Sequence, residues 1–164
     1  MPAEVTPCIP DFLDAVRAMF APYGLGIARV APGRPIPGSY WGDSEAGLVG
    51  DTLYLRDDTP LHSALHEGCH YLCMDQARRS ALHTDAGGEI AEENGVCYLQ
   101  ALLSSRIPGY GMDRLFADMD AWGYSFRLGS AARWFAGDAA DARAWLVAHG
   151  LIDEHGEPTG RRRP

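Results

Sequence analysis

The stretch TPLHSALHEGCHYLCMD, Thr59 to Asp75, decides how the rest of the sequence is interpreted. Thr59 is a good N-cap and Pro60 suits the first helical position, so the sequence predicts that a helix begins here. Leucines follow at helical spacing on one side, and histidines lie on the adjoining side at about 100° per residue. We therefore expect a helix with a core face and a separate histidine face.

The histidine face carries the pattern H-E-x-x-H in His66, Glu67 and His70. Residues four apart are neighbours on a helix, so two imidazoles are aimed at one point. A catalytic zinc ion takes three protein ligands and keeps one position open. His66 and His70 are predicted to be two ligands of one Zn²⁺ per chain, with Glu67 as the general base. His62 is either exposed, a partner of a ligand or a substrate contact, and Cys73 is either a thiolate ligand or a buried core residue.

The third ligand is expected on the next strong helical pattern, residues 87–109, which contains three glutamates. A short connection would let this helix pack antiparallel to the first, so that its start meets the end of the histidine helix. Glu92 has the best face, because an apolar stripe follows it at helical spacing. Glu93 is the second candidate and Glu89 the third.

Composition excludes some classes of protein without choosing a function. The chain has 164 residues, 46% hydrophobic residues and a net charge of −8 without an acidic block, which argues against nucleic-acid binding. We see no signal peptide or membrane span and expect a cytoplasmic protein with four reduced cysteines. One domain is expected over residues 1–157, followed by a flexible basic tail at 158–164.

The remaining elements indicate an α+β protein. Gly68 and Gly95 are expected to permit close backbone approach between the two central helices. In chain order we expect a helix at 10–24, a strand at 25–32, a hairpin at 38–58 whose second arm is Thr52 to Arg56, and short helices at 112–123, 130–137 and 138–150.

HEGCH (66–70) followed by EENGVCYLQALL (92–103) resembles the gluzincins, and in particular the ImmA/IrrE-like minimal metallopeptidases. The resemblance covers roughly residues 25–105. It implies a zincin-like core, in which a small sheet packs on the H-E-x-x-H helix and on a Glu-bearing helix, with a helical C-terminal part. It also implies Glu92 as the third ligand, with Glu93 at a variable position, and Thr52 to Arg56 as an edge strand that lines the substrate cleft.

These observations predict a zinc-dependent peptidase whose partner is a peptide or protein substrate, with no nucleic-acid or membrane partner. Two alternatives stay open, a non-catalytic regulator that keeps the zincin fold and binds a protein, and a metal-free structural domain. A cleft plugged by the aromatic segment 118–135 would favour the regulator. The unranked candidates for stabilising an oxyanion are Tyr110, Tyr124 and His83. The tryptophans expected to anchor the core are Trp122, Trp134 and Trp145.

Overall fold

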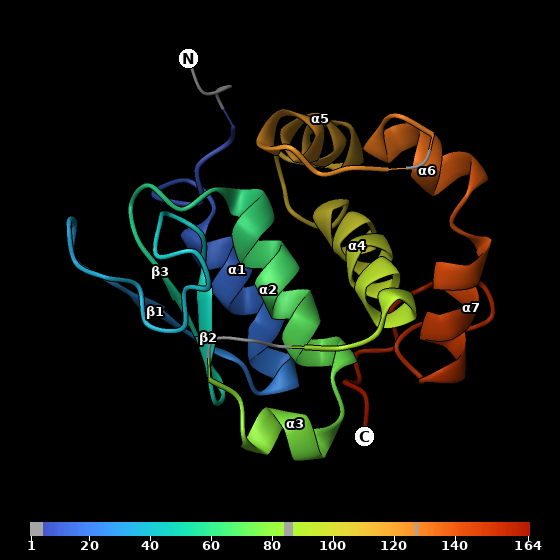
Figure 1. Cartoon of the computed structure of the whole chain (residues 1–164), viewed down its shortest axis with the longest axis horizontal. Helices are drawn as coiled ribbons and strands as arrows, with labels where there is room; N and C mark the ends of the chain where they lie inside the picture. The colour runs from blue at the N-terminus through green and yellow to red at the C-terminus, as the bar shows by residue number, and fades with distance from the viewer. Residues whose placement is uncertain (1–4, 84–86, 127) are drawn as a thin grey trace.

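A small sheet and a set of helices make up the part of the chain that the structure describes, residues 5–83, 87–126 and 128–164 of a computed structural model (Figure 1). The expected α+β class is confirmed, although α3 lies outside the predicted elements. In chain order the elements are α1 (Leu13–Phe20), η1 (Ala21–Tyr23), β1 (Gly26–Arg29), β2 (Gly47–Val49), β3 (Thr52–Leu55), α2 (Leu61–Cys73), α3 (Gln76–Ser80), α4 (Ile90–Ser104), α5 (Met112–Trp122), α6 (Ala131–Gly137) and α7 (Ala140–Ala148).

The three strands form one sheet in the order β1-β3-β2. β3 pairs antiparallel with β2 through a tight turn, in which Gly50 has a φ of 56°, and it pairs parallel with β1. The expectation that Thr52 to Arg56 is the edge strand is therefore wrong, because β3 is paired on both sides. β2 lies at the edge, where Val49 makes an isolated bridge with His83.

Helix α2 begins one residue later than the sequence predicts. Pro60 is its N-cap, in an extended conformation with a ψ of 146°, and no side chain caps the helix. Thr59 does not cap it because its hydroxyl accepts a hydrogen bond from the backbone N–H of Arg56 at 2.9 Å, which stabilises the turn after β3. The helix is buried on almost every side, so its histidine face lies inside the molecule.

Helices α2 and α4 pack side by side and antiparallel, as expected (Figure 1). Gln100, late in α4, donates a hydrogen bond to the carbonyl oxygen of His62, early in α2, at 2.8 Å. His70, late in α2, lies 2.9 Å from Glu93, early in α4. This arrangement brings the start of α4 to the end of α2.

Gly68 and Gly95 do permit close packing, but the elements that pack against them are not the ones predicted. A Cβ atom on Gly68 would lie 2.3 Å from the ring of Phe20, and one on Gly95 would lie 2.8 Å from the ring of Trp145. The glycines therefore admit aromatic side chains from α1 and α7, the helices that flank the central pair. They do not bring α2 and α4 closer to each other.

The C-terminal residues pack against the body of the protein. The backbone N–H of Arg163 donates to the carbonyl oxygen of Leu72 at 2.9 Å, and its guanidinium lies 2.9 Å from the carboxylate of Glu92. Its carbonyl oxygen accepts a hydrogen bond from Arg79. Arg163, within the predicted flexible basic tail at 158–164, thus contacts carbonyl and carboxylate acceptors on α2 and α4.

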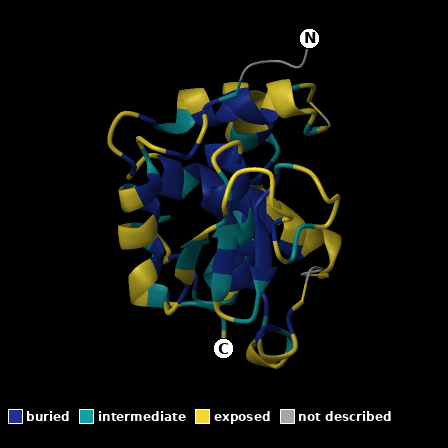
Figure 2. Cartoon of the chain, turned by 90° about the vertical axis from the view of Figure 1, so that its left-hand side faces the viewer, coloured by how far each residue is buried: buried dark blue, intermediate teal, exposed yellow. Residues whose placement is uncertain are grey.

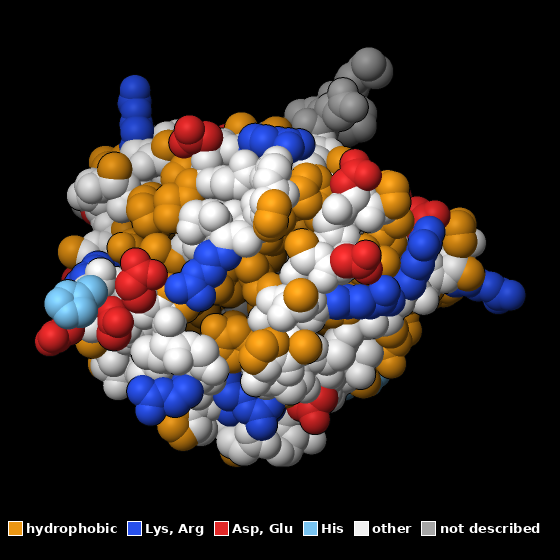
Figure 3. All heavy atoms as spheres, turned by 180° about the vertical axis from the view of Figure 1, so that it is seen from behind, with side chains coloured by type: hydrophobic (Ala, Val, Ile, Leu, Met, Phe, Trp, Pro, Cys, Tyr) orange, Lys and Arg blue, Asp and Glu red, His pale blue; other side chains and the backbone are white. Residues whose placement is uncertain are grey.

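Buried residues gather in the interior, while exposed residues occupy the outer helices and loops (Figure 2). On the face seen in Figure 3, arginine and acidic side chains are interspersed with apolar ones. All four cysteines are free, in line with the expectation of reduced thiols, and all four are buried. Within the described ranges, no helix combines the length and the apolar character needed to cross a membrane.

Candidate metal centre

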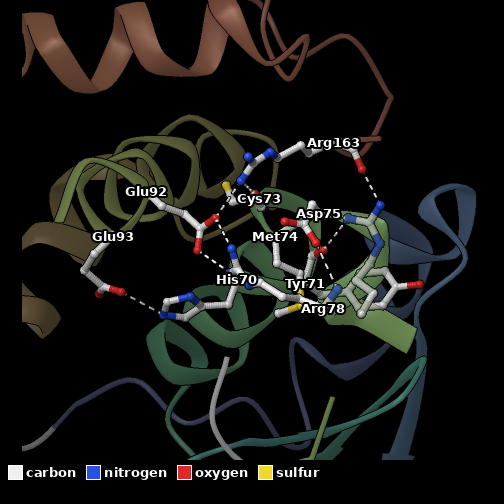
Figure 4. A network of polar contacts seen from close by, with 10 residues as sticks. His70, Tyr71, Cys73, Met74, Asp75, Arg78, Glu92, Glu93 and Arg163 are labelled. Carbon is white, nitrogen blue, oxygen red and sulfur yellow. Dashed lines mark hydrogen bonds and ion pairs between the residues drawn. The ribbon is translucent and has the colours of Figure 1, made fainter. Parts of the chain in front are cut away.

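The carboxylate of Glu93 lies against both histidines of the H-E-x-x-H motif. Its Oε1 is 3.0 Å from Nε2 of His66, and its Oε2 is 2.9 Å from Nε2 of His70. Figure 4 shows Glu93 reaching from α4 toward His70 on α2. Both histidines are buried, with exposed fractions of 9% and 8%. The carboxylate of Glu93 therefore bridges the two histidine nitrogens, each through a different oxygen.

Glu92, the expected third ligand, faces another way. Its carboxylate accepts hydrogen bonds from Arg78 at 3.0 and 2.5 Å and from Arg163 at 2.9 Å (Figure 4). Glu92 does lie on the buried face of α4, but two arginines neutralise it there. The structure brings Glu93 to the histidines instead, because successive residues of a helix are turned by about 100°.

The spacing of these donors suits a zinc ion. Ligand atoms about 2.0–2.2 Å from a tetrahedral zinc ion are about 3.3 Å from one another. The separations of 3.0 and 2.9 Å between Glu93 and the histidines are only slightly shorter. His66, Glu67 and His70 also offer ligand atoms that lie within 4.8 Å of one another. A metal ion would take one oxygen of Glu93 in place of the two oxygens that contact the histidines here.

Gln100 sets the orientation and the tautomer of His66. Its amide nitrogen donates to the carbonyl oxygen of His62, so its Oε1, 3.0 Å from Nδ1 of His66, must accept a hydrogen bond. Nδ1 of His66 therefore carries a proton, and Nε2 is the atom left for a metal or a second proton. Carbonyl partners of this kind are typical behind metal-binding histidines. Gln100 was not predicted from the sequence, where its signal is a polar residue two turns after Glu93 on a buried helix face.

The surroundings shift the pKa values of the central groups. Burial lowers the pKa of His66, but hydrogen bonds with Cys97 and Glu93 help to outweigh burial, and the pKa is raised. Burial raises the pKa of Glu93, but the hydrogen bonds from the two histidines outweigh burial and lower it. These shifts show that a positive charge is stabilised between the Glu93 carboxylate and Nε2 of His66 and His70. Either protons or a divalent metal ion would supply that charge.

Glu67 lies beside this group at an open cleft of about 440 Å³. Burial raises the pKa of its carboxyl group, which makes the carboxylate a better proton acceptor. The cleft reaches His66 and Glu67 from the solvent side. Its lining residues are Tyr40, Trp41, Glu45, Ser63, His66, Glu67, Trp122, Gly123 and Tyr124.

Of the three candidates for stabilising an oxyanion, the structure brings Tyr124 to the cleft. Its ring centroid lies 5.5 Å from that of His66, and burial raises its pKa to about 12, so its hydroxyl keeps its proton at neutral pH. Tyr110 instead donates to Asp118 at 2.8 Å. His83 is exposed and pairs with β2.

The remaining candidates lie outside the group of ligand atoms. His62 is fully buried, not exposed, and its two ring nitrogens have no hydrogen-bond partner. Cys73 is buried beyond His70, and burial raises the pKa of its thiol well above the usual value. Glu89 is the exposed N-cap of α4. Of the tryptophans expected in the core, Trp122 is instead 43% exposed at the cleft.

Cys97 is a further potential ligand, one turn after Glu93 on α4. Its sulfur, a nitrogen of His66 and an oxygen of Glu93 lie within 4.8 Å of one another. If this thiol joined the two histidines and Glu93, the four ligands would close a structural site and leave no position for water. Without it, the three ligands leave the open position that a catalytic site needs.

Comparisons with protein-family models, with curated proteins and with solved structures found no match to this chain. The function proposed below is therefore inferred from the chain's own residues.

Proposed function

We propose that this protein is a zinc-dependent peptidase of the zincin-like type. The observation that carries the proposal is the position of Glu93, whose carboxylate meets Nε2 of both His66 and His70, beside a cleft lined by Glu67. Two histidines and one carboxylate are the ligand set of glutamate-ligand zinc peptidases. Glu67 in the cleft is the carboxylate that such chemistry requires as a base.

The arrangement of elements supports the same proposal. The H-E-x-x-H helix α2 follows the small sheet and packs antiparallel to α4, which carries the acidic ligand. This order resembles the core of the ImmA/IrrE-like metallopeptidases. The proposed ligand set differs from the motif in one position, because Glu93 takes the role that the resemblance gives to Glu92.

A zinc ion bound here would act as a Lewis acid that polarises a substrate carbonyl and lowers the pKa of water. Glu67 would accept the proton of the attacking water and deliver it to the leaving amine. Tyr124, protonated at neutral pH, would donate a hydrogen bond to the developing oxyanion. Gln100 holds the His66 ring in the orientation that directs Nε2 toward Glu93.

The open cleft favours a peptidase over the non-catalytic regulator. Trp122, Gly123 and Tyr124 form one side of the cleft, while His66 and Glu67 remain part of its lining. The described residues of the aromatic segment 118–135 therefore border the cleft and leave His66 and Glu67 in its lining.

The test is cleavage of a mixed peptide library by the zinc-loaded protein, with products identified by mass spectrometry. Glu67→Gln should abolish cleavage and leave the zinc content unchanged, because Glu67 is placed as a base. Glu89→Gln is the matched control, since the exposed Glu89 lies away from the histidines. Full activity in Glu67→Gln would refute the mechanism, and zinc binding without any cleavage would favour the regulator.

A further inference from the structure

Exposed aromatic side chains concentrate at the candidate cleft. Among the described residues, large apolar side chains with high exposure include Tyr40 at 60%, Trp41 at 80% and Trp122 at 43%. These three residues line the same cleft as His66 and Glu67. Exposed apolar groups that gather at one place mark a binding surface, whereas scattered ones carry no such meaning.

Hydrogen bonds within its loop hold Trp41 in an exposed position. The carboxylate of Glu45 accepts hydrogen bonds from the backbone N–H of Trp41 at 2.6 Å and from the hydroxyl of Ser39 at 2.5 Å. The Ser39 hydroxyl in turn accepts from the backbone N–H of Gly42 at 3.0 Å. Tyr40 packs edge-on against Trp41, with 4.9 Å between ring centroids. The fold thus holds an indole in solvent at the rim of the cleft.

A second aromatic wall comes from the end of α5. Gly123 ends this helix with a φ of 108°, and the chain then turns so that Trp122 and Tyr124 both pack on the buried ring of His62. The ring centroids lie 5.0 and 5.6 Å from that of His62. Contacts with a buried ring fix both side chains, so this wall is also positioned before any ligand arrives.

We propose that the cleft contains a subsite for a large apolar side chain, aromatic above all, of a peptide residue next to the bond that is cleaved. Trp41, Tyr40 and Trp122 would contact this side chain, since aromatic rings bury much apolar area and pack edge-to-face. The carboxylates of Glu45 and Glu67 line the same cleft, so an acidic side chain is disfavoured. This subsite rests on the proposed function, because the zinc centre fixes which peptide bond lies beside it.

Amino-acid hydroxamates test the subsite, because the hydroxamate group binds zinc and the side chain reports on the cleft. We would titrate the zinc-loaded protein with phenylalanine, alanine and aspartate hydroxamates by calorimetry. Phenylalanine hydroxamate should bind at least about tenfold more tightly than alanine hydroxamate, and aspartate hydroxamate should bind most weakly.

Variants separate the aromatic contact from the metal. Trp41→Ala should bring the phenylalanine-to-alanine affinity ratio close to one while zinc content and alanine hydroxamate affinity stay unchanged, and Trp41→Phe should restore most of the ratio. Leu128→Ala, at an exposed apolar residue outside the cleft lining, is the control and should change nothing. Equal affinities in the wild-type protein, or a ratio that Trp41→Ala does not alter, would overturn the subsite alone. No binding by any hydroxamate would overturn the zinc centre and the subsite together.

Discussion

Glu92 and Glu93 are adjacent, yet the structure gives them opposite roles, and Glu→Gln substitutions at the two positions should separate stability from metal binding. Glu92 is 3% exposed and is bound by two arginines whose side chains are 34% and 22% exposed. Removing one partner from a fully buried ion pair costs about 3–5 kcal/mol. Because the arginines retain contact with water, we expect Glu92→Gln to lower the free energy of unfolding by about 2–3 kcal/mol.

Glu93→Gln should instead lower zinc affinity more than it lowers stability. The side chain of Glu93 is 48% exposed, so its replacement should lower the stability of the metal-free protein by about 1 kcal/mol, less than Glu92→Gln does. Its carboxylate, however, meets both histidines, and zinc affinity should fall by more than about 100-fold. Glu92→Gln should keep its zinc affinity within a few-fold of wild type.

The assays are urea denaturation followed by tryptophan fluorescence in the presence of EDTA, and zinc competition against a chromogenic chelator. The prediction is a crossed pattern, in which one variant loses stability and its neighbour loses metal. If Glu92→Gln lost zinc and Glu93→Gln retained it, the assignment of the third ligand would be wrong, and the sequence resemblance would have named the correct residue.

Three further predictions concern residues around the centre. Gln100→Leu should weaken zinc binding by about 10–100-fold in the same competition assay, because nothing then orients His66; unchanged affinity would contradict its role. Burial lowers the pKa of His62 to about 3, whereas the unfolded chain takes up that proton near 6.5. The contribution of His62 to stability in EDTA should therefore be fully present above pH 6.5 and fall below it by up to about 1.4 kcal/mol per pH unit, and His62→Phe should remove this part of the pH dependence in urea denaturation. Arg163→Ala should lower the free energy of unfolding by about 1–2 kcal/mol, because it removes one arginine from Glu92, and an unchanged urea midpoint would show that the C-terminal contact does not stabilise the fold.

The sequence predicted the α+β class, the histidine helix and its antiparallel partner because each rests on local periodicity. Hydrophobic spacing over more than ten residues is a strong signal for a helix. The order of strands is not a local property, so the pattern at Thr52 to Arg56 identified a strand without showing that it is central. The N-cap of α2 was predicted one residue too early for a similar reason, because the Thr59 hydroxyl is bound by the backbone N–H of Arg56 in the preceding turn.

The error over the third ligand has a specific cause. A glutamate on the buried face of a helix requires a cation as its partner, and that cation can be an arginine as well as a metal ion. The cations that Glu92 contacts are Arg78, from α3, and Arg163, from residues predicted to be a flexible tail. Neither contact can be inferred from spacing along α4. With Glu92 neutralised, Glu93 is the acidic residue that remains for the histidines.

The most direct test of the central claim is a crystal structure of the zinc-loaded protein with anomalous data collected at the zinc edge. We predict one strong peak, about 2.0–2.2 Å from Nε2 of His66, Nε2 of His70 and a carboxylate oxygen of Glu93, with a solvent molecule in the remaining position. A peak bound by Cys97 in that position would indicate a structural site. No peak at the histidines, or one bound by Glu92, would contradict the proposed centre.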